Sequence, residues 1–178
     1  MLCNGRLTHK SRRGPPTGGC HTVLRAEVHA VRTIPDLKVD GLEYFERWWQ
    51  RARARRRLPP ITAIDPTVFP KALPTIFLLD GETVETLRVR LAGTFYRELY
   101  NREVTGEYLA DLIPFADRPD IYAEYQACLR EGRPAYHDGT VTWRGQGAEL
   151  AFRRILLPFG DSGKVQRIMG FAEFKMDS

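Results

Sequence analysis

The hydrophobic pattern begins with an amphipathic helix expected over residues 41–57. Its apolar positions recur three and four residues apart, which places them on one face; they are Leu42, Phe45, Trp48, Trp49 and Ala52. Asp40 is the expected N-cap, and Pro59-Pro60 stops the helix. Each tryptophan can bury on the order of 200 Å², too much apolar area to leave in water. We therefore expect this helix to pack on its own domain or on a second copy of the chain.

Five later segments have the pattern of β-strands, and short helices lie between the second and the third. The strands are expected over 75–80, 86–92, 135–143, 149–157 and 165–174, and the helices over 94–101, 107–113 and 117–131. In the second strand, Leu87, Val89 and Leu91 alternate with two arginines. Short loops at 144–147 and 160–163 make the last three strands an antiparallel meander, and the first two strands form a hairpin.

The helix over 117–131 is the clearest in the middle of the chain. Asp117 or Asp120 is its expected cap, and Gly132 supplies a left-handed C-terminal residue. The chain shows no strand–helix–strand alternation, which disfavours a parallel, doubly wound sheet. Because the last strands are apolar on both faces, both must be covered. We predict an α+β fold, a five-stranded antiparallel sheet with short helices on one face and the aromatic helix on the other.

Length and charge divide the chain further. The 178 residues correspond to about one domain. Residues 1–35 hold six basic groups and one acidic group, which accounts for the whole net charge of +5. Their composition predicts a basic, disordered tail, followed by an N-terminal cap helix over 36–58 and a core over 59–178. Since the core is neutral, a nucleic-acid-binding domain is disfavoured; binding of nucleic acid or an anionic membrane by the tail stays an alternative.

Several classes of protein are excluded by what the sequence lacks. No apolar run approaches the roughly 18 residues of a membrane-spanning helix, and no secretory signal is evident. Three cysteines form no disulfide framework, so the cytoplasm is expected. The tail's cysteines and histidines match no zinc spacing, and we expect no metal. The motifs of hydrolases, phosphate loops and metalloproteases are missing, so we expect no enzyme and no catalytic residues.

The order of elements resembles a PAS domain with a helix ahead of its core. Several short sequence segments resemble those of the short stand-alone bacterial PAS-domain proteins, and the resemblance covers about residues 40–175. They are Leu58-Pro59 with Ile64-Asp65-Pro66, Leu73-Pro74, Phe77-Leu78-Leu79-Asp80, Arg90-Leu91-Ala92-Gly93-Thr94, Glu103-Val104-Thr105-Gly106, Leu156-Leu157-Pro158 and Ile168-Met169-Gly170. The resemblance implies a sensory or interaction module, usually a homodimer, that passes a ligand- or partner-driven shift through its flanking helix. The cofactor stays unknown, because the fold hosts flavins, haems, small acids or nothing.

Cys128 and His137 are candidates for cofactor chemistry, and the pattern favours a plainer role for each. Flavin-binding light sensors of this fold carry an Asn-Cys-Arg-Phe-Leu-Gln run, which this chain lacks, so Cys128 is interpreted as a small buried hydrophobe. His137 is the one histidine after residue 35. We interpret it as hydrogen-bonded or exposed rather than as a haem ligand.

Polar-tipped aromatics between the sheet and the middle helices favour a mostly apolar pocket with a few hydrogen-bonding points. The candidate lining residues are Arg90, Thr94, Tyr96, Tyr100, Tyr125 and Trp143, with Arg90 and Thr94 placed to orient a small anionic ligand. The alternative is a filled core whose tyrosine hydroxyls reach solvent.

Three hypotheses for function follow. The first is a PAS signalling protein that acts through ligand- or partner-dependent protein–protein interaction; the last expected strand ends four residues before the C-terminus, so no output domain is expected. The second is a ligand-free, constitutive adaptor or dimerisation module. An interior cavity under about 100 Å³ favours the adaptor, because drug-sized pockets begin near 300 Å³. The third is the tail-driven binder, whose binding would depend steeply on salt.

Overall fold

The computed structural model describes residues 41–141 and 150–176, which form one α+β unit. Its strands are β1 (Ile76–Asp80), β2 (Arg88–Ala92), β3 (Ala135–Val141), β4 (Leu150–Phe159) and β5 (Arg167–Met176). Its α-helices are α1 (Gly41–Arg53), α2 (Thr94–Tyr100), α3 (Leu109–Leu112) and α4 (Pro119–Glu131), joined by short 3₁₀ turns. The predicted tail and the Asp40 cap lie outside the described residues.

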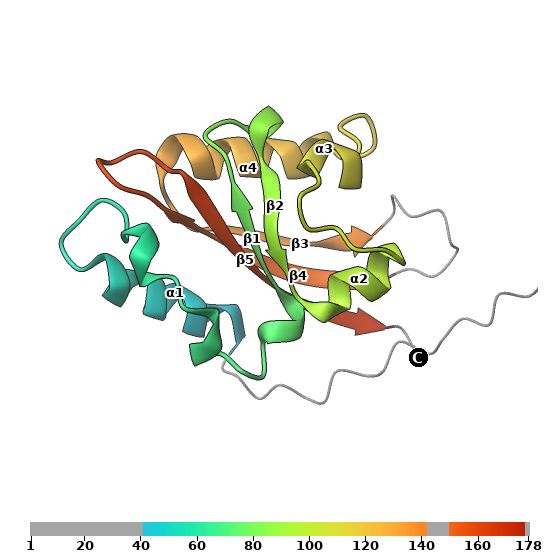
Figure 1. The fold of residues 1–178 in the computed structure, drawn as a ribbon, viewed down its shortest axis with the longest axis horizontal. Helices are drawn as coiled ribbons and strands as arrows, with labels where there is room; N and C mark the ends of the chain where they lie inside the picture. The colour runs from blue at the N-terminus through green and yellow to red at the C-terminus, as the bar shows by residue number, and fades with distance from the viewer. Residues whose placement is uncertain (1–40, 142–149, 177–178) are drawn as a thin grey trace, which may run out of the picture. The chain divides into compact units, whose positions relative to one another are not determined.

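The five strands form one antiparallel sheet in the order β2-β1-β5-β4-β3 (Figure 1). The predicted five-stranded sheet is confirmed, including the β1–β2 pair and the β3–β4–β5 meander. The pairing of β1 with β5 was not predicted. It joins Ile76 to Phe171, almost a hundred residues apart on the chain, and such pairings leave no local signal in a sequence.

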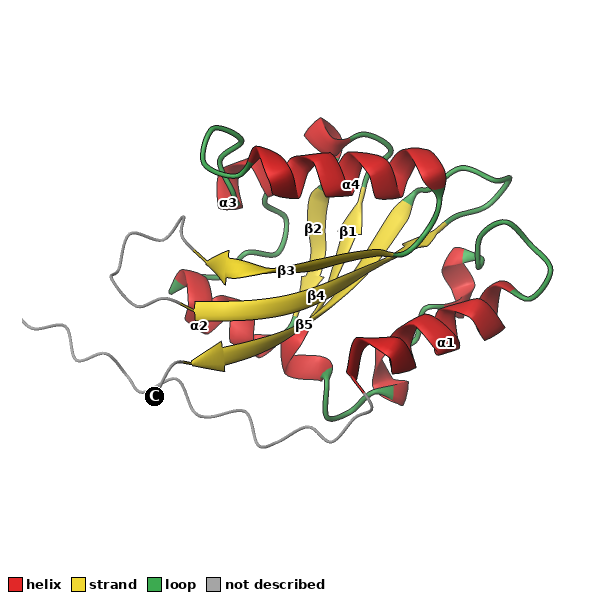
Figure 2. Cartoon of the chain, turned by 180° about the vertical axis from the view of Figure 1, so that it is seen from behind, coloured by secondary structure: helices red, strands yellow, loops and turns green. Residues whose placement is uncertain are grey.

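The sheet is covered on both faces, as the apolar strands required (Figure 2). Helix α4 packs on β3 and β4 on one face, and α1 packs on β4 on the other. The Phe45 ring stacks on Phe171 of β5 with ring centroids 4.1 Å apart. The indole nitrogen of Trp49 donates a hydrogen bond of 2.7 Å to the Pro158 carbonyl. The apolar face of α1 is therefore covered by its own domain.

The predicted residues of α1 differ in how deeply they are buried. Leu42, Phe45 and Trp49 are fully buried, whereas Trp48 and Ala52 are half-buried. The Trp48 ring meets Phe69 edge-on at 5.1 Å and lies 5.9 Å from Phe159. Both tryptophans thus contribute to the core, with Trp48 at its edge.

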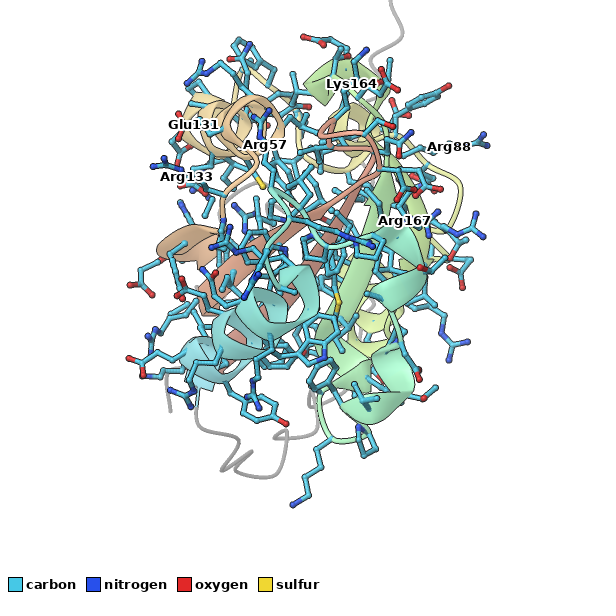
Figure 3. The ribbon with its side chains drawn as sticks, turned by 90° about the vertical axis from the view of Figure 1, so that its left-hand side faces the viewer. Arg57, Arg88, Glu131, Arg133, Lys164 and Arg167 are labelled. Carbon is cyan, nitrogen blue, oxygen red and sulfur yellow. The ribbon has the colours of Figure 1, made fainter. Side chains whose placement is uncertain are left out.

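Helix α1 ends at Arg53, four residues before the predicted end. Ala54 adopts the left-handed conformation with φ +49°, which stops the helix. The chain then turns so that Leu58 enters the core at 3% exposure. Arg57 lies beside the C-terminal end of α4 (Figure 3), where its guanidinium donates to the carbonyls of Arg130 and Glu131. A cation at this position complements the negative end of the α4 dipole.

Helix α4 ends as predicted but begins differently. Gly132 takes the left-handed conformation, φ +64°, and its N–H bonds to the Cys128 carbonyl. The predicted cap by Asp117 or Asp120 is wrong, because Pro119 is the first helical residue and Arg118 holds the N-cap position. Asp120 instead lies inside the first turn, where Arg118 binds it.

Strand β2 departs from strict alternation at one position. Leu78 pairs with Leu91 and Leu79 pairs with Val89, so Arg90 is an extra residue that forms a bulge. The bulge shifts the side chains on its C-terminal side, and Leu91, expected on the buried face, is 38% exposed.

Candidate functional site

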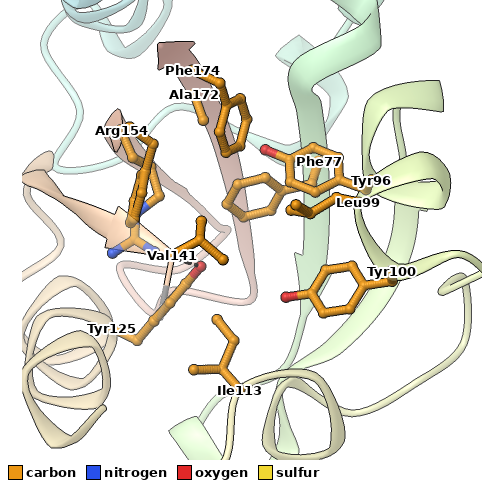
Figure 4. Close-up of a pocket in the computed structure, with 11 residues that line it drawn as sticks. Phe77, Tyr96, Leu99, Tyr100, Ile113, Tyr125, Val141, Arg154, Ala172 and Phe174 are labelled. Atoms are coloured by element: carbon orange, nitrogen blue, oxygen red, sulfur yellow. Dashed lines mark hydrogen bonds between the residues drawn. The ribbon is translucent and has the colours of Figure 1, made fainter. Parts of the chain in front are cut away.

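A small cavity of about 60 Å³ lies between the sheet and the helices α2 to α4. Alternate residues of the strands face it, and aromatic residues of α2 and α4 close it (Figure 4). Its lining is Phe77, Tyr96, Leu99, Tyr100, Ile113, Tyr125, Val141, Phe152, Arg154, Ala172 and Phe174. Most of this surface is apolar. Among the described residues that line it, Arg154 is the one with a charged side chain.

One side of the cavity depends on a glycine. The Phe77 ring lies directly on Gly170 of the neighbouring strand, and a Cβ at that position would come within 1.9 Å of the ring. Only glycine leaves room for the far end of the ring this close to the strand. Gly170 therefore sets the position of an aromatic wall of the cavity.

The predicted pocket residues divide into three groups. Tyr96, Tyr100 and Tyr125 line the cavity. Arg90 and Thr94 do not: Arg90 is the exposed bulge residue and lies 3.5 Å from Asp80, and Thr94 is the exposed first residue of α2. The pattern placed them near the end of β2 but did not show the bulge. Trp143 lies outside the described residues.

The tyrosine hydroxyls around the interior bond within the protein instead of reaching solvent. Tyr96 donates to the Thr75 carbonyl at 3.0 Å, and Tyr122 donates to the Ile113 carbonyl at 2.9 Å. The Tyr125 hydroxyl accepts from Arg154 at 3.4 Å. Burial raises the pKa of Tyr125, which keeps its hydroxyl protonated. The expectation that tyrosine hydroxyls reach solvent is wrong for these tyrosines.

Arg154 is a functional candidate that the sequence reasoning missed. Its side chain is buried at 4% exposure, with the guanidinium 4.8 Å above the Tyr125 ring. One terminal nitrogen donates to Glu124 at 2.7 Å. Its Nε has no hydrogen-bond partner among residues 41–141 and 150–176. The alternation of β4 gives only a weak signal, because Arg154 shares one face with Phe152 and Leu156 while its neighbour Arg153 shares the other, equally apolar face.

Glu124 connects Arg154 to His137. Its second carboxylate oxygen bonds to Nδ1 of His137, and Nε2 of that ring lies 3.1 Å from the Arg118 guanidinium. A guanidinium only donates, so Nε2 accepts and the imidazole proton lies on Nδ1. Arg118 also donates to the Thr140 carbonyl at 2.9 Å and to Asp120. The interpretation of His137 as a hydrogen-bonded histidine fits this arrangement.

Cys128 lies on the buried face of α4 at 1% exposure. Burial raises the pKa of its thiol to about 12, so the thiol stays protonated near neutral pH. This position fits the interpretation of a small buried hydrophobe. Among the described residues, no group of three or more histidine, cysteine, aspartate or glutamate side chains is arranged to hold a metal ion.

Similarity to known proteins extends over most of the described chain. A family model described as PAS domain matches residues 37–173. Similar solved structures include the PAS domain of BvgS from Bordetella pertussis, which is 19% identical with a TM-score of 0.48, covering 62% of this chain and 83% of that chain. The PAS domain of an HTR-like protein from Haloarcula marismortui is 13% identical with a TM-score of 0.38, covering 57% and 80%. No curated protein matches this chain.

The sheet order, the helices on its two faces and the small cavity on one side define an α+β module built on an open antiparallel sheet. The family match extends over more than half of the chain and includes α1 as well as the sheet, so this chain belongs to the PAS domain family. Within the described residues, no helix is both long and apolar enough to cross a membrane.

Proposed function

We propose that this protein is a non-catalytic, cytoplasmic signalling module in which a change in the interior cavity is passed through the sheet to α1 and alters a protein–protein interaction. The observation that carries the proposal is the alternation of β4 and β5. Arg154 and Ala172 face the cavity, while the adjacent Ile155 and Phe171 belong to the opposite face, where Phe171 stacks on Phe45. One sheet layer therefore separates the cavity from α1.

A constitutive adaptor is the second candidate, and the size of the cavity favours it. About 60 Å³ lies below the limit of roughly 100 Å³ expected for an adaptor and far below the roughly 300 Å³ of a drug-sized site. A flavin or a haem does not fit this space without rearrangement. The sensor proposal thus requires a very small ligand or a partner-driven change.

Homodimer formation stays part of the proposal, although α1 no longer provides an argument for it. The tryptophans of α1 suggested a partner chain, but their own domain covers them. Sedimentation or light scattering of the full chain tests the oligomeric state. The tail-driven alternative concerns residues outside the described part and is tested by salt dependence with and without residues 1–35.

Hydrogen exchange in α1 tests the proposed transmission. Ala172→Val adds two methyl groups toward the cavity, and Ala123→Val makes the same change at an exposed position of α4. We expect Ala172→Val to change the hydrogen-exchange rates of the α1 amides by about threefold or more, because local opening responds to packing. This change should be larger than any change in the exchange rates of α3. Ala123→Val should leave α1 unchanged. Equal α1 exchange in the wild type and both variants would favour the adaptor.

A further inference from the structure

We propose that an arginine-rich surface at the C-terminal end of α1 binds an acidic, carboxylate-rich segment of a partner protein. The surface consists of residues 51–57 and 130–133, and we name it the arginine surface. The inference rests on the proposed function, since it names the class of partner in the protein–protein interaction that α1 would alter. It depends on the charge of these residues, on the partners of their side chains and on the chemistry that the surface offers.

The arginine surface joins two segments that lie far apart in the sequence. Residues 51–57 contain five arginines, and residues 130–133 add two arginines and one glutamate, which gives a net charge of +6. The guanidinium of Arg57 donates to the carbonyls of Arg130 and Glu131 at 3.3 and 3.4 Å. Figure 3 shows Arg57 close to Glu131 at one end of the described domain. The two segments therefore form one basic surface.

This concentration of charge is not explained by the helices beside it. Residues 36–178 have no net charge, so the rest of that range carries a charge of −6. The dipoles of α1 and α4 favour the arginines at their own C-terminal ends. Arg55 and Arg56 lie exposed in the turn after Ala54, which ends α1 with φ +49°. Neither dipole accounts for these two cations, and crowded like charges destabilise the fold.

The guanidinium groups of the arginine surface differ from the other described arginines in their partners. Outside this surface, seven of the nine described arginines form an ion pair with a carboxylate. On the surface one of seven does: Arg130 lies 3.1 Å from its neighbour Glu131. Arg55, Arg56 and Arg133 are exposed and have no carboxylate partner within the described residues. The surface thus offers guanidinium groups that can pair with carboxylates of another molecule.

The chemistry of the surface favours an acidic polypeptide over a membrane or a nucleic acid. A planar guanidinium can form two parallel hydrogen bonds with one carboxylate. None of the large hydrophobic side chains exposed in the described part of the chain belongs to this surface, so it has no group that would insert into a bilayer. It also holds no aromatic side chain on which a nucleic-acid base could stack. A long duplex would extend beyond it onto the acidic remainder of the domain.

Arg53 connects the arginine surface to the packed face of α1. Its guanidinium lies 5.6 Å from the Trp49 ring, its Nε donates to the Gln50 side chain at 2.7 Å, and a terminal nitrogen donates to the Arg56 carbonyl at 3.4 Å. Trp49 in turn is hydrogen-bonded to the Pro158 carbonyl of β4. A shift of α1 on the sheet therefore changes the arrangement of these arginines, which is how the proposed function would alter binding of the partner.

Binding of an acidic peptide to the full chain tests the inference. The probe is a short fluorescein-labelled peptide of alternating glutamate and glycine, followed by fluorescence anisotropy, and the same peptide with glutamine is its control. We expect Arg55→Glu with Arg56→Glu to weaken binding of the glutamate peptide at least about fivefold, because two attractive pairs become repulsive. Added sodium chloride should weaken binding to the wild type, because salt screens exposed pairs.

Lys71→Glu with Lys175→Glu is the matched control variant. Both lysines are exposed and lie outside the arginine surface. The two double variants have the same net charge and keep the basic residues 1–35, so they differ only in where the charge is reversed. The control variant should weaken binding of the glutamate peptide by less than about twofold.

The outcomes separate this inference from the proposed function. Selective loss of peptide binding in Arg55→Glu with Arg56→Glu supports the arginine surface, even if the exchange rates of α1 do not respond to Ala172→Val. Equal binding of the glutamate peptide to both double variants, or equal binding of the glutamine peptide to the wild type, overturns it. An α1 response to Ala172→Val without selective loss of peptide binding overturns only the arginine surface.

Two further measurements test the choice of partner. The acidic protein segment is overturned if the substitutions at Arg55 and Arg56 weaken binding of a DNA duplex, or of vesicles of equal parts phosphatidylcholine and phosphatidylserine, more than binding of the peptide. It is also overturned if sedimentation shows self-association that these substitutions abolish, because the partner is then a second copy. If the glutamate variant does not fold, Arg55→Gln with Arg56→Gln against Lys71→Gln with Lys175→Gln decides the outcome.

Discussion

Arg118 illustrates how single residues organise the charge beside the cavity. Its guanidinium reaches Asp120, the Thr140 carbonyl and the His137 ring, which ties the start of α4 to the edge strand β3. The hydrogen bonds from Arg118 lower the pKa of Asp120 from 3.8 to about 2. The ion pair therefore stabilises the folded state only while Asp120 is ionised.

Asp120→Asn should lower the free energy of unfolding at pH 7 by about 1 kcal/mol or less, because the carboxylate is half exposed and solvent screens the pair. Because the pKa of Asp120 is lower in the folded protein than in the unfolded chain, its ionised carboxylate stabilises the folded state. This stabilisation is present above about pH 4 and is lost as the pH falls toward 2. The difference between wild type and variant in urea unfolding should therefore shrink as pH is lowered from 5 to about 3.

Asp117→Asn is the control, because it removes an exposed carboxylate next to Arg118 in the chain but keeps the Asp120 pair. A difference between wild type and Asp120→Asn that grows as pH falls would contradict the assigned pairing.

At the scale of elements, α1 completes the core of the domain. Phe45 is fully buried and contacts both Phe171 of the sheet and Phe69 of the segment before β1. The hydrogen bond from Trp49 to Pro158 fixes the helix along β4. The helix is thus an integral layer of the domain, and changes in the sheet reach it by direct contact.

Phe45→Ala should reduce the free energy of unfolding by about 3–5 kcal/mol, the usual cost of truncating a buried phenylalanine. Gln50→Ala, on the exposed side of the same helix, should change it by no more than about 0.5 kcal/mol. Urea unfolding followed by tryptophan fluorescence measures both. A loss below about 1 kcal/mol for Phe45→Ala would show that α1 does not pack on the sheet in solution.

Much of this element structure was predictable, because its signals are local. The 3.6-residue spacing of Leu42, Phe45 and Trp49 predicted α1, and Gly132 marked the end of α4. The bulge at Arg90 depends on how β2 pairs with β1, so alternation alone placed Leu91 on the wrong face. The Arg154–Glu124 contact joins two elements 30 residues apart and has no local signature. The site was therefore less predictable than the fold.

At the scale of the whole described domain, the sheet is the shared layer between cavity and helix. Each residue of β5 faces one side or the other, so Ala172 lines the cavity and Phe171 contacts α1. Interiors packed at crystal-like density transmit small displacements because few voids absorb them. The central claim is that the state of the cavity and the packing of α1 are energetically coupled through this layer.

A double-mutant cycle between Ala172→Val and Phe45→Leu measures that coupling most directly. The two side chains lie on opposite faces, and independent sites add within about 0.3–0.5 kcal/mol. We predict a coupling free energy in urea unfolding above about 0.5 kcal/mol for this pair and additivity for Ala172→Val with Gln50→Ala. Additivity in both cycles would contradict transmission from the cavity to α1.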